Sequence, residues 1–95
     1  MGMVTFVDET TSGARTAGPR LPVREERLTL RELIRRRVDH ETTDGTAFAR
    51  AVEAFGRNGF LVLVGDRQVE ELDETVTVGP ETEVVFLRLV PLVGG

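Results

Sequence analysis

The sequence has no cysteine, and this absence removes several kinds of chemistry at once. With no thiol among its 95 residues, the chain has no disulfide, no thiol nucleophile and no thiolate ligand for a metal. Its one histidine, His40, stands without clustered carboxylates, and a single imidazole does not make a metal site. We therefore expect no bound metal or other cofactor, and we assign His40 no role.

Lysine is also absent, so that all twelve basic side chains are arginines. A GC-rich coding bias explains this simply, because arginine replaces lysine freely on solvated faces. One consequence holds whatever the origin of the bias. Without a side-chain amine, the chain can accept an acyl group only at its α-amino group, so branched chains built from this protein alone are excluded.

Aromatic residues are scarce, and acidic residues outnumber basic ones. The five aromatics are all phenylalanine and the formal net charge is −4, which argues against nucleic-acid partners that bind through basic side chains and stacked rings. No apolar run approaches the roughly 20 residues of a membrane span, and the first residues lack the features of a signal peptide. We expect a cytoplasmic protein without a membrane partner.

Ninety-five residues fit one domain, which we place at residues 1–90, followed by a flexible tail at residues 91–95. The patterns predict a first strand at 3–8, a polar loop at 10–18 and a second strand at 20–26. Pro22 lies in that second strand and predicts a sheet edge, because proline cannot donate to a ladder. Further strands are expected at 60–64, 67–70 and 83–90, with a polar crossover at 71–82.

The clearest local signal is the start of a helix. Thr29 and Glu32 have the spacing of a capping box, with Leu28 and Leu33 placed as a hydrophobic staple. One stripe of the helix holds Leu30, Leu33, Ile34, Arg37 and Val38, with the Arg37 stem at its edge. We interpret residues 35–37, three arginines, as a solvated helix end, with a docking patch for an acidic partner as the alternative.

A second helix is expected after Thr46, its predicted N-cap. Phe48, Val52 and Phe55 recur at helical spacing, and Asn58-Gly59 predicts a left-handed end.

The last predicted strand presents two faces. Val85, Leu87 and Leu89 share one of them. The other is formed by Val84, Phe86, Arg88 and Val90, and we take this second face as the candidate partner-binding surface, opposite the helix. The alternative is that it faces the core, since a shift of one residue inverts the assignment.

The order of elements predicts an α+β fold with a mixed sheet wrapped on one main helix. The first and last strands are expected to lie parallel in the middle of the sheet, with the other strands at its edges. This order matches the ubiquitin-like β-grasp, to which the second helix is an insertion.

Residues 60–95 resemble the second half of ubiquitin and of the bacterial sulfur carriers, namely the molybdopterin-synthase small subunit and the thiazole-pathway carrier. The shared features are a hydrophobic strand, a turn with glycine, a short strand, a polar crossover and a last hydrophobic strand followed by Gly94-Gly95. The segment 87–89 is similar to the tail of ubiquitin, whereas 90–95, with a proline before its glycines, is closer to the molybdopterin-synthase type. The second helix and the lack of lysine depart from both, so the chain resembles a bacterial ubiquitin-like modifier.

The resemblance implies that the chain is not an enzyme but the substrate of one. A partner activating enzyme would use Mg-ATP to adenylate the carboxylate of Gly95, the acyl donor. Gly94 and Gly95 lack Cβ and leave the carboxyl carbon open to attack. Pro91, Leu92 and Val93 would thread the partner's channel, since residues 91–95 reach about 17 Å when extended.

Three functions remain open at this point. The first is a protein modifier, with a conjugating enzyme, an isopeptidase and target proteins as further partners. The second is a sulfur carrier, whose Gly95 becomes a thiocarboxylate for cofactor or tRNA thiolation. The third is an adaptor or assembling subunit of the same fold that never reacts. The first two use the same tail, so the sequence does not separate them.

Overall fold

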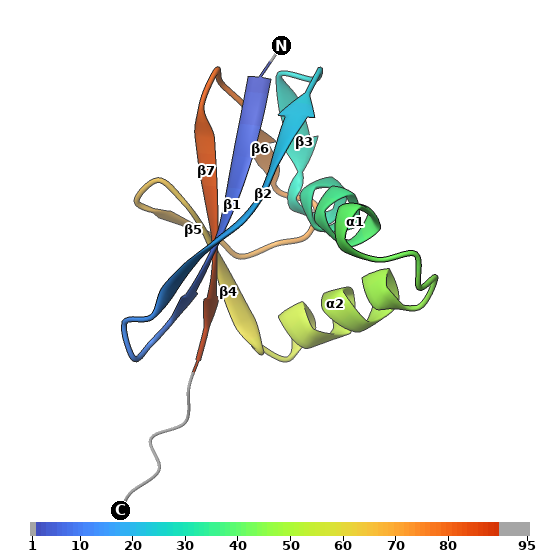
Figure 1. Ribbon diagram of the computed structural model, residues 1–95, viewed down its shortest axis with the longest axis vertical. Coiled ribbons are helices and arrows are strands. Elements are labelled where there is room, and N and C mark those ends of the chain that lie inside the picture. The colour runs from blue at the N-terminus through green and yellow to red at the C-terminus, as the bar shows by residue number, and fades with distance from the viewer. Residues whose placement is uncertain (1, 90–95) are drawn as a thin grey trace, which may run out of the picture.

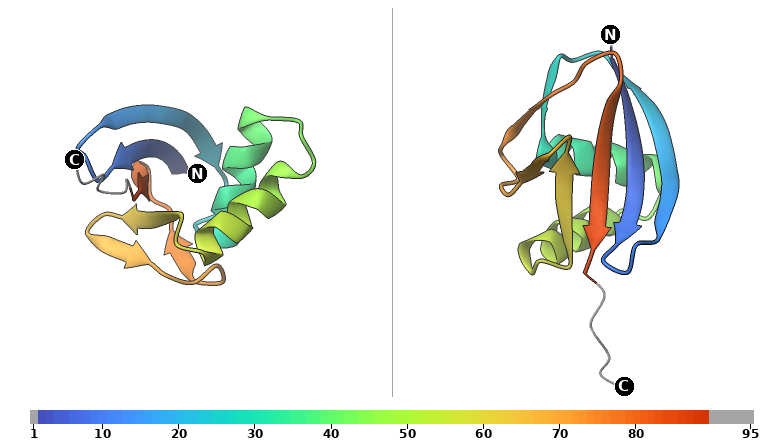
Figure 2. Two further views of the ribbon diagram at one scale, coloured as in Figure 1. Left: turned by 90° about the horizontal axis from the view of Figure 1, so that it is seen from below. Right: turned by 90° about the vertical axis from the view of Figure 1, so that its left-hand side faces the viewer.

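The computed structural model describes residues 2–89 of the chain. Seven strands and two helices follow in the order β1 (Gly2–Thr10), β2 (Arg15–Val23), β3 (Arg27–Thr29), α1 (Leu30–Glu41), α2 (Ala47–Gly56), β4 (Phe60–Val64), β5 (Arg67–Val69), β6 (Thr75–Thr77) and β7 (Thr82–Arg88). Five strands form the main sheet in the order β2-β1-β7-β4-β5, and β3 and β6 form a separate pair. Both helices lie on one face of the main sheet (Figure 2).

The last strand, β7, lies in the middle of the main sheet. It runs parallel to β1 and antiparallel to β4. Edges are formed by β2 and β5, each of which has one neighbour in this sheet. The expected arrangement of a mixed α+β sheet, with its first and last strands parallel at the centre, is confirmed and is compatible with a β-grasp-like fold.

The edge strand β2 begins earlier than expected. The prediction of a loop at 10–18 is wrong for residues 15–18, because β1 and β2 pair as far as Glu9 and Arg15. The ladder is irregular between Thr5 and Val7, where Gly18 comes close to β1. A Cβ on Gly18 would lie 3.0 Å from the carbonyl oxygen of Phe6, so this close approach favours a residue without a side chain.

Pro22 protects the free edge of β2, as expected of an edge strand. Pro22 pairs with Met3, whose own N–H donates to the carbonyl oxygen of Gly79, away from β2. Paired residues point their backbone groups either toward each other or apart. The nitrogen of Pro22 therefore faces the outer edge, where the missing N–H deprives an incoming strand of a hydrogen bond.

Helix α1 begins with the predicted capping box. The Thr29 hydroxyl accepts from the Glu32 N–H at 3.2 Å, and the Glu32 carboxylate accepts from the Thr29 N–H at 2.8 Å. The N–H groups of Leu30 and Arg31 donate to carbonyl oxygens of Glu74 and Leu72 in the crossover. The first turn of α1 is thus tied to a segment more than forty residues away in the sequence.

The crossover before β7 carries a strand that the sequence did not reveal. Residues 27–29 pair antiparallel with residues 75–77, as β3 and β6. Three-residue strands are too short for a period-two pattern to be recognised. The pair buries Leu28 and Val76 against the core that α1 and the main sheet share.

Helix α2 is present, and Thr46 is its N-cap residue as predicted. The Thr46 backbone is helical, however, and its side chain makes no capping bond. Instead, Asp44 accepts from both the N–H and the hydroxyl of Thr46, at 2.9 and 2.8 Å. The predicted end is confirmed, because Asn58 has φ 60° and Gly59 N–H donates to the carbonyl oxygen of Ala54 at 2.8 Å.

The hydrogen bonds that Asp44 accepts predict that the stability of the fold depends on pH. Its pKa is lowered from 3.8, mainly by the hydrogen bond from the Thr46 N–H. A carboxylate whose pKa is lower in the folded than in the unfolded state stabilises the fold at pH values above its unfolded pKa. This contribution is lost as the pH falls through its folded pKa. Urea unfolding should therefore show that Asp44→Asn is less stable than the original chain at neutral pH and equally stable well below pH 3.8. An unchanged difference at low pH would contradict this role.

Neither α1 nor α2, the helices of the described range, has the length and apolar character needed to cross a membrane.

Candidate functional site

The end of β7 is held in place on both sides. Arg88 is the last residue of this strand, and it is level with Thr10 on β1 and with Phe60 on β4. Beyond the ladder, the N–H of Thr11 in the β1–β2 turn donates to the Arg88 carbonyl oxygen at 3.0 Å. The chain therefore leaves the sheet from a fixed point, at the end of the molecule opposite the start of β1 (Figure 1).

The whole predicted tail lies outside the described residues, namely Pro91, Leu92, Val93, Gly94 and Gly95. The same applies to Val90, a member of the predicted partner-binding face. Leu89, the last described residue, follows β7 and leaves 46% of its surface exposed. The Gly95 carboxylate as reactive group and residues 91–93 as threading segment therefore remain predictions. The end of β7, which precedes them, is described.

The predicted partner-binding face is wrong for its two apolar members within the described range. Val84 is fully buried, and Phe86 packs against the core beneath the helices. The Phe86 ring lies edge-on to Phe6 with centroids 5.7 Å apart and stacks on Phe60 at 5.0 Å. These side chains face the helices. The alternative stated above, that this face of the last strand is turned toward the core, is therefore the correct one.

The opposite face of the sheet carries a different apolar group, which we call the outer patch. It consists of Leu61, Leu63, Val85 and Leu87. Leu63 pairs with Val85 and Leu61 pairs with Leu87, so the four side chains share one face. Val85 is 8% exposed, while the three leucines are only partly buried. A contiguous apolar surface of this kind on an open sheet is typical of a site for another protein.

An ionic bridge crosses the sheet beside the outer patch. Arg15 on β2 pairs with Glu9 on β1, and its second nitrogen lies 2.8 Å from Glu83 on β7. The hydrogen bond that Arg15 donates to Glu83 is the main cause that raises the pKa of Arg15, whose guanidinium is charged at any physiological pH. The bridge joins three neighbouring strands and gives the apolar patch a charged rim.

The sequence did not predict an ion pair between α1 and β1 in which the arginine is buried and the carboxylate is partly exposed. Arg37 of α1, with 8% of its side chain exposed, donates two hydrogen bonds to Asp8 of β1, at 2.8 and 2.6 Å. It also donates to Glu41 at 3.0 Å, and its guanidinium lies 4.8 Å from the Phe86 ring centroid. Burial alone lowers the pKa of Arg37, but the bonds to both carboxylates outweigh it and raise the pKa.

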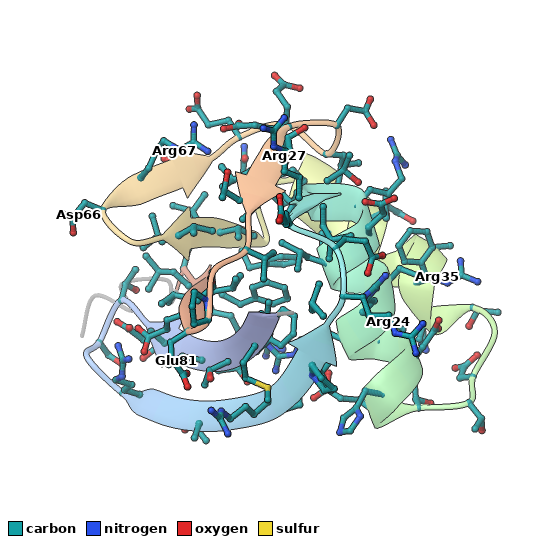
Figure 3. All side chains as sticks on the ribbon, turned by 90° about the horizontal axis from the view of Figure 1, so that it is seen from above. Arg24, Arg27, Arg35, Asp66, Arg67 and Glu81 are labelled. Atoms are coloured by element: carbon teal, nitrogen blue, oxygen red, sulfur yellow. The ribbon has the colours of Figure 1, made fainter. Side chains whose placement is uncertain are left out.

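The three successive arginines of α1 do not form one patch. Arg37 points inward, Arg36 pairs with Glu25, and Arg35 projects outward to Asp39 at 3.2 Å and over the Phe48 ring (Figure 3). Each therefore has an acidic partner within the fold, and the alternative of a basic docking patch gains no support from their arrangement.

Residues 2–89 hold no group of three or more acidic or histidine side chains placed to bind a metal ion. Comparison of the chain with protein family models, with curated proteins and with solved structures finds no match.

Proposed function

We propose that this chain is a ubiquitin-like protein modifier of the β-grasp fold, with Gly95 as the terminal residue of its reacting form. The observation that carries the proposal is the position of β7. The last strand lies at mid-sheet, pinned between β1 and β4, and a short segment ending in Gly94-Gly95 follows it in the sequence. The sheet would thereby hold the start of the tail in a fixed position. Gly94 and Gly95 have no side chains that would obstruct a nucleophile at the carboxyl carbon of Gly95.

The proposed chemistry begins at the Gly95 carboxylate. One carboxylate oxygen attacks the α-phosphorus of Mg-ATP in the activating enzyme, which releases pyrophosphate and leaves an acyl-adenylate. A thiolate of the partner then attacks the acyl carbon and AMP departs, giving a thioester. Finally, an amine of a target lysine attacks the thioester, the thiol leaves with a proton, and an amide bond remains.

The outer patch supplies a surface for the partner. Its leucines are accessible on the face that neither α1 nor α2 covers, and they lie on β7, from which the tail leaves, and on the neighbouring β4. Apolar contact there would provide affinity, and the rim formed by Arg15, Glu9 and Glu83 would add orientation. In this proposal the body is recognised on the outer face and the tail reacts at a distance from it.

The sequence offers a specific readout for conjugation. Arg88 is the last tryptic site, and the chain has no lysine, so trypsin would leave the seven residues 89–95 on any modified target lysine. We expect proteomics of cells that make the protein to find this remnant on lysines of other proteins. It should disappear when Gly95 is deleted.

Other outcomes of the same experiment separate the competing functions. If the remnant is absent and the intact chain gains the mass of one sulfur in exchange for one oxygen, the chain is a sulfur carrier. Should neither product form while the Gly95 deletion keeps full cellular function, the chain would be an adaptor that does not react, and the modifier proposal would be refuted.

A further inference from the structure

A cleft of about 580 Å³ lies on the helix side of the sheet, between α2, α1 and the end of β7. The sheet contributes the stacked rings of Phe60 and Phe86, and α1 contributes Ile34 and Val38. This cleft is separate from the outer patch, which lies on the opposite face of the same strands.

The cleft exists because the wall formed by α2 is made of alanines. Ala47, Ala51 and Ala54 line it, at the spacings of four and three that define one helix face. The two phenylalanines of α2 do not line the cleft: Phe48 lies under the Arg35 guanidinium and Phe55 contacts Phe60. All of α2 lies within the described part of the chain, and none of its residues is buried. The helix thus leaves apolar surface uncovered.

The charges around the cleft make Arg88 available to a partner. The lining holds three arginines, Arg37, Arg50 and Arg88, and two carboxylates, Asp8 and Glu41. Both carboxylates already bind Arg37. Arg50 pairs with Asp44 but keeps 68% of its side chain exposed, and Arg88 has no ion pair among residues 2–89.

We propose that this cleft binds a partner protein segment with an apolar side chain next to a carboxylate. The apolar side chain enters between the alanines of α2 and Phe86, where it displaces water from apolar walls. The carboxylate then meets Arg88 and Arg50 at the mouth, with charge-assisted hydrogen bonds. The site goes beyond the proposed function, since binding here needs neither Gly95 nor its activation.

A pair of matched peptides tests the chemistry of the occupant. The probes are acetyl-Glu-Phe-Leu-Glu-amide and acetyl-Lys-Phe-Leu-Lys-amide, titrated into the full ¹⁵N-labelled chain and followed by NMR chemical shifts. We expect the acidic peptide to shift the amides of α2 and of Phe86, and to bind about two- to fivefold more tightly than the basic one. Equal binding of both, or shifts confined to the outer patch, would overturn the proposal.

Two substitutions on α2 test the location. Ala51→Leu places a larger side chain inside the cleft, whereas Ala49→Leu adds the same atoms on the exposed side of the helix. Ala51→Leu should weaken the acidic peptide at least about tenfold and Ala49→Leu should leave its affinity unchanged. If Ala51→Leu binds the peptide as well as the original chain, the location is wrong. Arg88→Gln, a surface change, should independently remove the preference for the acidic peptide.

Two other occupants are outcomes of the same titration. If replacing Leu92 and Val93 by serine in the full chain strengthens peptide binding about tenfold or more, the chain's own tail fills the cleft and the proposal fails. It also fails if sedimentation shows a dimer that Ala51→Leu dissociates, because a second copy is then the occupant.

Discussion

Replacing Val84 by arginine is expected to unfold the protein, whereas Leu87→Arg, three residues further along β7, leaves it folded. Val84 is fully buried between the sheet and the helices, so a charge there lies in an apolar core without a partner. A cost of about 4 kcal/mol or more follows, which is a large part of the stability of a typical small domain. Circular dichroism and urea unfolding measure both variants.

Leu87→Arg is the matched substitution on the other face. Leu87 is partly exposed on the outer patch and lies opposite Glu9 on β1, which an arginine can pair with. We expect its stability to change by less than about 1 kcal/mol, while its reaction with an activating enzyme falls at least about tenfold through loss of apolar contact. A folded Val84→Arg variant would contradict the assignment of the two faces, and a fully active Leu87→Arg variant would contradict the role of the outer patch.

The second large effect is expected at Arg37. Arg37→Met keeps most of the side-chain volume but removes the bonds to Asp8 and Glu41 and the contact with the Phe86 ring. Breaking a buried ion pair is costly, although about half of each carboxylate's side chain is exposed and can be solvated by water. We expect a loss of about 2 kcal/mol in the free energy of unfolding, measured by urea titration.

Arg35→Met serves as the control for this substitution. Arg35 lies on the same helix and pairs with Asp39, but both side chains are more than half exposed. Its loss should change the stability by no more than about 0.5 kcal/mol. If the two variants lose equal stability, Arg37 does not hold α1 to β1 in the way described. A double-mutant cycle with Asp8→Asn would then show no coupling.

The sequence predicts those elements whose signals are local and strong. The capping box at Thr29 and Glu32 and the left-handed end at Asn58 are present where their residue types require them. The apolar run at 60–64 predicts β4, and the strand predicted at 83–90 corresponds to β7, which ends at Arg88 instead. The order of elements predicts the neighbours of both strands. Such features depend on a few residues near one another in the chain.

The remaining features depend on distant partners. The strand at 75–77 forms because residues 27–29 pair with it, and a three-residue pattern carries no period that would reveal this. The face of β7 that meets the helices is a question of register, which the alternation of Val84 and Val85 leaves undecided because both positions are apolar.

One signal for the buried pair was present in the sequence. Val4, Phe6 and Asp8 alternate on one face of β1, so Asp8 is an inward-facing charge. Arg37 falls in the apolar stripe of α1, so it is a second inward-facing charge. Two opposite inward charges on elements that pack together predict an ion pair, because a buried charge without a partner is costly.

The most direct test of the account concerns the acid group of Gly95 alone. The chain is prepared in two forms that differ only at that group, a free carboxylate and an amide, and each is incubated with the activating enzyme and ATP labelled at the α-phosphate. We predict that labelled AMP becomes attached to the form with the free carboxylate and not to the amide. Equal labelling of both forms would show that the activated group lies elsewhere, and would contradict the proposal that Gly95 is the acyl donor.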